Sequence, residues 1–292
     1  MGRPAAAVDP PDRSAAVVAL WVLARPWNAL ITALSVAVGA LTGGLPIVSA
    51  RVALAALGAA LIAGAGNALN DWVDVATDRV NRPERPLPAG RLSRRAALVE
   101  AALLAGGGLA AAAAASGWHL LVGAAVLAGL IAYDLRLKAT VLWGNLAVAA
   151  LAAAAFPYGA LGPHWPGRSW APAVFAGVFH FGREIVKDLE DTAGDQACGL
   201  RTLPLAHGRR AAARLAAVTF LCLAAATWYP WLSHTYGRAY LAAVFPVDAL
   251  LLVAAAALLR GLTPAGSGLL ARCLKPGMLL GLLAIVIGEL GR

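Results

Sequence analysis

One stretch decides the fold: VALAALGAALIAGAGNAL (residues 52–69) runs directly into NDWVDVATD (residues 70–78). The first part is apolar almost throughout and has about the length that a helix needs to cross a hydrocarbon core of roughly 30 Å. The second part holds three aspartates and an asparagine. Charged residues at the end of a membrane span are costly, so this junction predicts a membrane helix that ends in a functional site.

The composition of the whole chain agrees with a membrane location. The 292 residues are 60% hydrophobic and 13% charged, whereas soluble domains are about 45–50% apolar and about 25% charged. The mean hydropathy is +0.72. These values exclude disorder and make a soluble domain a poor description, because so much apolar surface exceeds what one core can bury.

Further apolar runs of similar length predict nine transmembrane helices, so the expected fold is all-α and polytopic. The expected spans are 17–41, 52–69, 96–115, 120–133, 141–158, 171–186, 211–228, 240–259 and 278–290. Residues 1–16 are polar and proline-rich and are expected to form a disordered cytoplasmic tail, not a cleaved signal peptide. Residues 17–292 are expected to form a single transmembrane domain.

The basic residues indicate the orientation in the membrane. The net charge is +9, and of the 24 Lys and Arg residues all but Arg51, Arg168, Arg238 and Arg292 fall in the tail or in alternate loops. By the positive-inside rule the N-terminus is cytoplasmic, the C-terminus lies outside and the acidic end of residues 52–78 faces the cytoplasm. The chain shows no nucleic-acid-binding signature, so no nucleic-acid partner is expected.

A second acidic segment, residues 184–195, resembles the first in spacing. At 100° per residue, a helix places the following acids and amides of the two segments on one face each: Asn67, Asp71, Asp74 and Asp78, with Asn70 at the margin, and Glu184, Asp188, Asp191 and Asp195. Glu190 points elsewhere and is expected to be solvated. A pair of ordinary solvated helix ends is the simpler explanation, but it does not explain why like charges are stacked twice.

A divalent cation explains the stacking, because carboxylate and amide oxygens without His or Cys suit Mg²⁺. The three cysteines are far apart and indicate no zinc site. Basic residues near the acids are suited to a diphosphate, although for each of them positive-inside bias is the alternative explanation. They are Arg79, Arg82, Arg85, Lys138, Arg183, Lys187 and Arg201.

At these residues the chain resembles the UbiA superfamily of intramembrane prenyltransferases. Residues 70–78 look like its NDxxDxxxD motif, followed by NRPxRPxPxG at 81–90, and residues 187–204 resemble its second, DxxxD motif. Within the superfamily, RPWN at 25–28, GREIVKDLED at 182–191 and KPGMLLGL at 275–282 are similar to the digeranylgeranylglyceryl phosphate synthase branch. The family's YxxxK motif is not matched, because Lys138 stands five residues after Tyr133, so the register of the lysine is open.

The resemblance implies nine helices around a central cavity that is open to lipid, and two Mg²⁺ ions that clamp a polyprenyl diphosphate. The implied metal ligands are Asn70, Asp74, Asp78, Asp191 and Asp195, and the catalytic acids are Asp71, Asp74, Asp78, Asp191 and Asp195. The candidate substrate-binding residues are Asn28, Asn67, Arg85, Tyr133, Lys138, Arg183, Lys187, Asp188 and Arg201. Trp72 or Tyr133 is the candidate for stabilising a carbocation.

The expected reaction is Mg²⁺-dependent transfer of a polyprenyl group, geranylgeranyl in the first place, to the hydroxyl of a prenylated glycerol phosphate, which gives an ether lipid. Prenylation of an aromatic acid such as 4-hydroxybenzoate or homogentisate is the alternative. A CDP-alcohol phosphotransferase would need its acidic motif on one helix, and a secondary transporter would place its acids near the bilayer midplane. Neither pattern fits residues 70–78 and 184–195.

Overall fold

The computed structural model describes residues 13–292, and within that range every regular element is a helix. The elements are α1 Arg13–Ala24, α2 Pro26–Thr42, α3 Ala50–Val73, α4 Val75–Asn81, α5 Arg94–Ala115, α6 Gly117–Leu135, the 3₁₀ helix η1 Leu137–Ala139, α7 Trp143–Ala153, α8 Ala155–Gly159, α9 Trp170–Ala197, α10 Leu203–His207, α11 Arg209–Ala226, α12 Tyr229–Leu232, α13 Arg238–Arg260 and α14 Pro264–Leu290.

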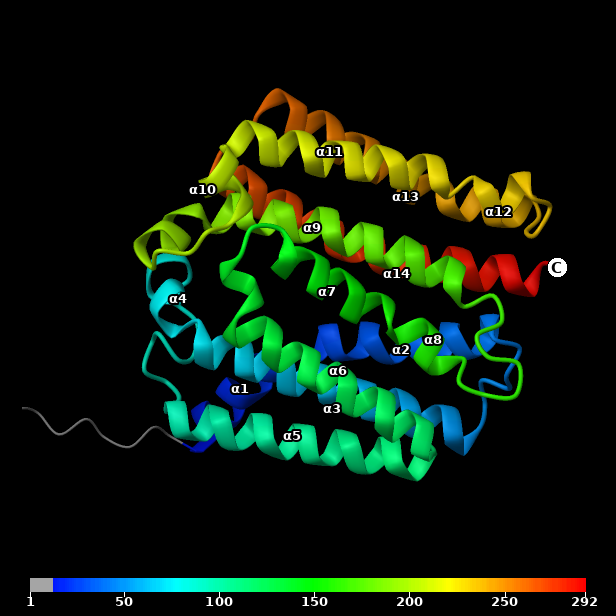
Figure 1. Cartoon of the computed structure of the whole chain (residues 1–292), viewed down its shortest axis with the longest axis horizontal. Helices are drawn as coiled ribbons and strands as arrows, with labels where there is room; N and C mark the ends of the chain where they lie inside the picture. Colours follow the sequence, from blue (N-terminus) through cyan, green and yellow to red (C-terminus); the bar gives the residue numbers. More distant parts are fainter. Residues whose placement is uncertain (1–12) are drawn as a thin grey trace, which may run out of the picture.

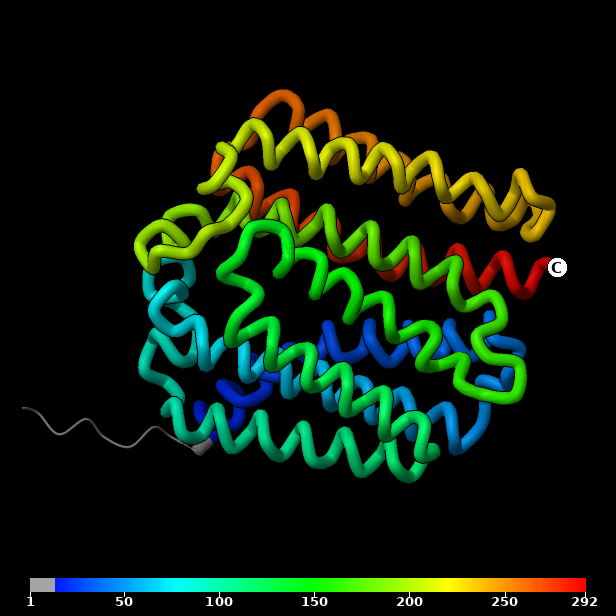
Figure 2. Tube along the Cα trace, viewed as in Figure 1, coloured from blue at the N-terminus to red at the C-terminus, as the bar shows by residue number. Residues whose placement is uncertain are grey.

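The long helices run side by side along one direction (Figures 1 and 2). Six of them close a ring of neighbours, in which α2 packs on α3, α3 on α6, α6 on α7, α7 on α9, α9 on α14, and α14 again on α2. Helix α5 covers α3 and α6 from outside, while α11 and α13 cover α9 and α14. Helices α4 and α10 lie together at one end of the bundle (Figure 1). Short elements, among them α4 and α10, therefore cover one end of the ring, which we call the roofed end.

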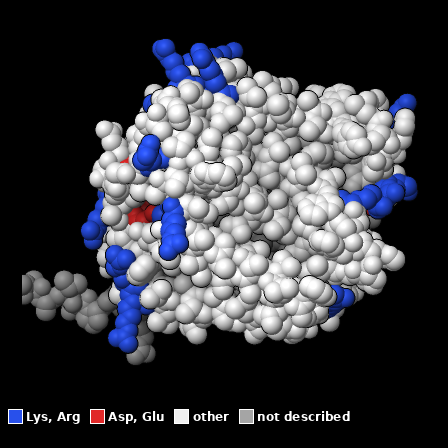
Figure 3. Space-filling view, in the orientation of Figure 1, with Lys and Arg blue, Asp and Glu red and all other residues white. Residues whose placement is uncertain are grey.

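The outer surface of the bundle is apolar. Many large hydrophobic side chains are exposed, among them Leu103, Phe245 and Val253, which are each about two-thirds exposed or more. Figure 3 shows a broad band free of charge between two ends that carry basic side chains. In water such an apolar surface would be a liability, whereas in a bilayer it is the expected lipid-facing surface.

The described residues contain six helices long and apolar enough to cross a membrane, or seven if α1 and α2 are one bent span. The expected number of nine is not confirmed. Residues 141–158 are divided between the short helices α7 and α8, and α9 carries Arg183, Glu184 and Lys187 within its length. The expected last span, 278–290, is only the second half of α14, which begins at Pro264.

Two breaks shape the roofed end. Arg25, with φ of 49°, separates α1 from α2, and Pro26 then opens α2 at a position where its missing N–H is not needed. Asp74 separates α3 from α4, so the first acidic segment is not one continuous helix as the periodicity predicted. Helix α1 already begins at Arg13, so residues 13–16 are helical and not a disordered tail. The rest of that predicted tail, residues 1–12, lies outside the described residues.

Close helix contacts depend on small residues. A Cβ on Gly159 of α8 would lie 1.9 Å from the carbonyl oxygen of Val36 in α2, so only glycine allows this approach. A larger apolar core joins α9, α11, α13 and α14 around Phe220, Leu251 and Leu274, which are fully buried. This core fixes α9, and with it the second acidic segment.

Candidate active site

The first acidic segment is held by arginines. Arg25 donates to Asp71, and Arg85 Nη1 lies 3.2 Å from Asp71 Oδ1 and 2.7 Å from Asp78 Oδ2. Both aspartates are buried, with 4% and 2% of their surface exposed. Burial raises the pKa of Asp78, and the Arg85 guanidinium offsets part of that rise. Arg85, a predicted substrate-binding residue, thus pairs with an aspartate near each end of the first acidic segment.

Asp74 lies at the break between α3 and α4 and accepts a hydrogen bond from Lys138. The chain brings Lys138 there by ending α6 at Leu135 and forming the turn η1. Asn70 donates through Nδ2 to Asp134 Oδ1 at 2.8 Å, which leaves its amide oxygen as the free acceptor. Asp134 did not appear among the sequence candidates; its signal was a carboxylate at the end of an apolar run, four residues before Lys138.

The second acidic segment lies on α9 and has its own partners. Lys187 Nζ donates to both oxygens of Glu184, at 3.0 and 2.8 Å, and Asp188 accepts from Asn145 of α7 at 2.8 Å. Asp195 is buried, with 6% of its surface exposed. Asn145 is not among the residues predicted from the sequence; its signal is a polar side chain in an apolar run.

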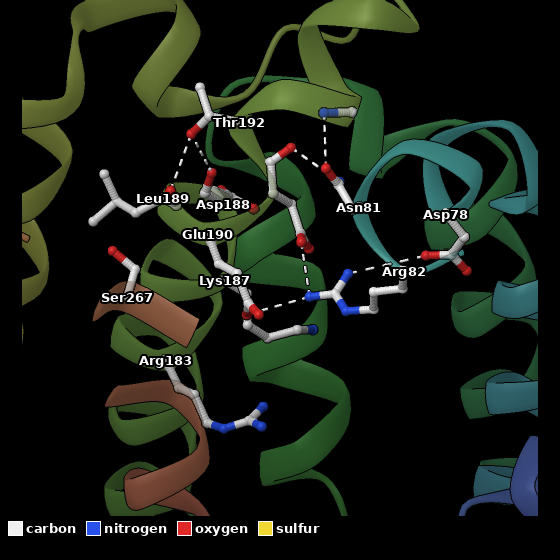
Figure 4. Close-up of polar contacts among 12 residues, drawn as sticks. Asp78, Asn81, Arg82, Arg183, Lys187, Asp188, Leu189, Glu190, Thr192 and Ser267 are labelled. Atoms are coloured by element: carbon white, nitrogen blue, oxygen red, sulfur yellow. Dashed lines mark hydrogen bonds and ion pairs between the residues drawn. The ribbon is translucent and has the colours of Figure 1, made fainter. Parts of the chain in front are cut away.

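Arg82 joins the two segments. Its Nη2 atom lies 2.7 Å from Asp191 Oδ1 and 3.2 Å from Glu190 Oε2, while Nη1 lies 3.9 Å from Asp78 Oδ1 (Figure 4). Burial lowers the pKa of Arg82, but the carboxylates of Asp191 and Glu190 more than offset this, so its pKa lies above the usual value. Glu190 was expected to be solvated away from the site. That expectation is wrong, because Arg82 forms ion pairs with both Glu190 and Asp191.

Asn81 fixes the same junction through the backbone of α9. Its Nδ2 donates to the carbonyl of Asp191 at 3.1 Å, and its Oδ1 accepts from the N–H of Gly194 at 2.9 Å (Figure 4). A Cβ on Gly194 would lie 2.4 Å from Asn81 Nδ2. The glycine is therefore needed for α4 to lie against α9, and the two acidic segments meet at the roofed end of the ring.

The remaining predicted residues lie at different places relative to the two acidic segments. Tyr133 is within electrostatic reach of Asp74, Glu184 and Asp188, so it lies between the two segments. The Asn67 Nδ2 donates to the carbonyl of Ala24 at 3.2 Å, so it supports the break before α2 instead of facing the acids. Trp72 packs under the guanidinium of Arg94, 4.6 Å from the ring centre, and is occupied there.

For two predicted substrate-binding residues, Asn28 and Arg201, the described part of the chain shows hydrogen bonds through the backbone only. Asn28 is half-buried in α2 and forms its hydrogen bonds through the backbone: its carbonyl accepts from Thr32 Oγ1, and its N–H donates to the carbonyl of Arg25. Arg201 is exposed, and its backbone N–H donates to the carbonyl of Ala139 at 3.3 Å. The contact joins the loop after α9 to the turn that carries Lys138.

The residues fit a hard divalent cation by donor chemistry. Between residues 13 and 292, no three carboxylate, His or Cys groups lie close enough to hold a metal ion, because Arg82, Arg85 and Lys138 lie between the acids. Mg²⁺ keeps several waters and needs only one or two carboxylates when substrate phosphates complete its shell. Asp191 Oδ1 is buried and is paired with Arg82 Nη2 at 2.7 Å. A buried carboxylate oxygen of this kind suits a hard cation, which would take the place of the guanidinium.

Comparison with known proteins assigns the chain to a family. Residues 15–271 match the UbiA prenyltransferase family. The chain belongs to this family. It is therefore a prenyltransferase and, with its long apolar helices, an integral membrane protein.

Individual relatives cover nearly the whole chain. Digeranylgeranylglyceryl phosphate synthase of Methanopyrus kandleri is 40% identical over 90% of this chain and 96% of its own length. The enzyme of the same name from Halobacterium salinarum is 39% identical over 92% of this chain and 96% of its own.

Solved structures share the fold. A digeranylgeranylglyceryl phosphate synthase structure has a TM-score of 0.70 at 25% identity and covers 94% of this chain and 98% of its own. A UbiA homologue from Archaeoglobus fulgidus bound to GPP and Mg²⁺ has a TM-score of 0.67 at 20% identity, with 92% of this chain and 98% of its own covered.

Proposed function

We propose that this prenyltransferase moves a geranylgeranyl group from its diphosphate to the hydroxyl of a prenylated glycerol phosphate and so forms an ether lipid. The observation that carries this proposal is the identity of 34–40% to several digeranylgeranylglyceryl phosphate synthases along most of the chain. The site agrees in chemistry, because acids and bases are concentrated at one end of an apolar ring of helices. A lipid substrate has the same division into a charged head and an apolar tail.

In the proposed reaction the bond between C1 of the allylic chain and the diphosphate oxygen breaks, and the diphosphate leaves with the electron pair. The acceptor hydroxyl oxygen forms the new C–O bond with C1 and gives up its proton to the leaving diphosphate. The ring of helices excludes water from the cationic carbon in the meantime. Tyr133, which is within electrostatic reach of both acidic segments, would stabilise that carbon through its aromatic ring.

The two acidic segments would hold two Mg²⁺ ions, one with Asn70, Asp74 and Asp78 and the other with Asp191 and Asp195. When bound, Mg²⁺ supplies Lewis-acid stabilisation of the charge on the leaving diphosphate. The neighbouring Arg82, Arg85 and Lys138 contact the carboxylates already. With metal bound to those acids, the same three cations would be available to bind the diphosphate oxygens.

For the topology, we propose nine crossings, with α7–α8 and α9 added to the spans that pass by length and composition. Helix α9 supports this because it packs against α7, α11 and α14 with its axis aligned with theirs (Figure 1). The roofed end then faces the cytoplasm with the N-terminus, and the C-terminus lies outside. Residues 17–292 would form one transmembrane domain.

The test is product analysis with detergent-purified enzyme, Mg²⁺ and geranylgeranyl diphosphate. Geranylgeranylglyceryl phosphate is offered in one reaction and 4-hydroxybenzoate in another. We expect ether lipid and diphosphate in the first reaction and no prenylated product in the second. Product with the aromatic acid alone would move the enzyme to an aromatic acceptor and refute the proposal.

A further inference from the structure

One guanidinium holds two neighbouring acids of α9 that differ in their proposed roles. Arg82 Nη2 lies 2.7 Å from Asp191 Oδ1, a proposed metal ligand, and 3.2 Å from Glu190 Oε2, which lies outside the proposed ligand sets (Figure 4). The three side chains are between 20% and 24% exposed. Opposite charges attract more strongly where water is partly excluded, so Glu190 is a second electrostatic partner of Arg82.

The place of the Glu190 carboxylate depends on α14 as well as on Arg82. A Cβ on Gly268 of α14 would lie 2.5 Å from Glu190 Oε1, so the glycine leaves room for the carboxylate between the two helices. Lys187, three residues earlier on α9, donates to both oxygens of Glu184 instead, at 3.0 and 2.8 Å. In the part of the chain that the structure describes, Glu190 therefore forms an ion pair with Arg82 alone.

The first acidic segment shows the same arrangement. Arg85 Nη1 lies 2.7 Å from Asp78 Oδ2, a proposed metal ligand, and 3.2 Å from Asp71 Oδ1, which is not one. In each segment an arginine is thus paired with one acid that a metal ion would take and with one acid that it would leave. The second acid balances the charge of the arginine after the first acid has bound metal.

Metal binding at Asp191 would deprive Arg82 of its nearest acid. A half-buried cation that loses its partner is destabilised. Glu190 supplies a partner without rearrangement, because the same Nη2 atom already contacts it. The other nitrogen, Nη1, lies toward the first segment, 3.9 Å from Asp78 Oδ1. An arginine held through Nη2 therefore keeps Nη1 between the two segments, where the diphosphate is proposed to bind.

We propose that Glu190 is a positioning residue, which holds Arg82 between the two acidic segments when Mg²⁺ takes Asp191 and so orients the guanidinium toward the diphosphate. This rests on the proposed function and deepens it. Glu190 itself contacts neither metal nor substrate and acts through Arg82. Loss of Glu190 should therefore weaken the joint binding of Mg²⁺ and diphosphate, but only while Arg82 is present.

The experiment is a double-mutant cycle on the full-length protein in detergent. The readout is the Mg²⁺ concentration that gives half of the maximal rise in Tm at a fixed concentration of inorganic pyrophosphate. For Glu190→Gln we expect this concentration to rise roughly fivefold or more, as for a lost charged hydrogen bond. In the Arg82→Gln background the same substitution should change it less than about twofold, because the two residues act as a unit. An equal rise in both backgrounds would overturn the proposal, since it would show that the Glu190 charge attracts Mg²⁺ directly.

Gly268→Ala tests the same role without a change of charge. The added methyl group meets only the flexible end of the Glu190 side chain, so it should displace the carboxylate and raise the required Mg²⁺ concentration as Glu190→Gln does. Glu84→Gln is the matched control, because Glu84 is an exposed acid in the loop after α4, and it should leave the Mg²⁺ response unchanged. A wild-type Mg²⁺ response of both Glu190→Gln and Gly268→Ala would refute the proposal.

Product analysis separates this role from the proposed function. If the wild type forms ether lipid and Glu190→Gln keeps the wild-type Mg²⁺ response, the role of Glu190 is refuted and the function stands. If the cycle shows the coupling but the wild type forms no ether lipid, the proposed function fails and the role stands. A wild type whose Tm does not respond to Mg²⁺ and pyrophosphate would also refute the role, because no cation would then compete with Arg82 for Asp191.

Discussion

Arg82 Nη2 lies 2.7 Å from Asp191 Oδ1, and this contact joins the segment after α3 to α9, which is distant from it in the sequence. Without Arg82, Asp191 would face Glu190 and Asp78 with no cation between them. The contact therefore has both a structural consequence, the docking of α4 on α9, and a chemical one, the placement of two sets of acids opposite each other.

Arg82→Gln should lower both stability and activity. Loss of a charged hydrogen bond at a half-buried pair costs about 1–3 kcal/mol, and the acids left behind repel. We expect a lower Tm and a kcat reduced at least tenfold. Arg79→Gln is the matched control, because Arg79 lies three residues earlier, on α4, and is exposed. Equal behaviour of the two variants in thermal unfolding and turnover would contradict the role given to Arg82.

Gly194→Ala should separate α4 from α9. The added methyl group would stand 2.4 Å from Asn81 Nδ2, which cannot retreat without losing its two hydrogen bonds to α9. We expect turnover to fall at least tenfold. Gly106→Ala serves as the control, because its Cβ meets nothing within 4 Å. Equal turnover of Gly194→Ala and Gly106→Ala would contradict this prediction.

Removal of divalent metal should stop turnover without unfolding the protein. Asp74 and Asp78 of the first segment and Asp191 of the second already have Arg or Lys partners, which balance much of the negative charge of the metal-free fold. Excess EDTA should therefore change the Tm by only a few degrees, read from tryptophan fluorescence. Mg²⁺ together with inorganic pyrophosphate should then raise the Tm, because a ligand that binds only the folded state stabilises it. Unfolding by EDTA alone would show that the metal is structural.

A substitution at the end of the bundle opposite the roofed end should affect stability but not turnover. Glu289 is 5% exposed and accepts hydrogen bonds from Arg168 at 2.9 Å and from Tyr236 at 2.7 Å, which ties the loop before α9 to the last helix. Glu289→Gln removes the charge and should cost about 1–3 kcal/mol. The kcat of the protein that remains folded should stay within about twofold of the wild type. A large loss of kcat at full folding would contradict this separation.

The sequence predicted what depends on local pattern. Apolar runs identified the helices at 52–69 and 96–115, and the i, i+3, i+4 spacing identified Asp71, Asp74, Asp78, Asp188 and Asp191 as members of two related segments. Helical periodicity is a property of neighbouring residues, so it can be read without knowledge of the fold.

Contacts between distant segments could not be predicted in the same way. Asn145 and Asp134 each stand alone in an apolar run, and only packing brings them to Asp188 and Asn70. The break at Arg25 redirects Asn67 to the carbonyl of Ala24, although its helical phase groups it with the acids. Glu190 was misjudged for a similar reason, because helical phase says nothing of an arginine that arrives from another helix.

The most direct test of the account is the rate of diphosphate release from geranylgeranyl diphosphate, with Mg²⁺ and the acceptor lipid, for the wild type, Asp74→Asn and Asp191→Asn. The account predicts that each substitution lowers the rate by about a thousandfold or more, because each segment supplies acids that the other cannot replace. Any fall in Tm should be no larger than that of Arg82→Gln, which breaks the same ion pair as Asp191→Asn. Near wild-type rates for both variants would show that the two acidic segments do not form the catalytic site.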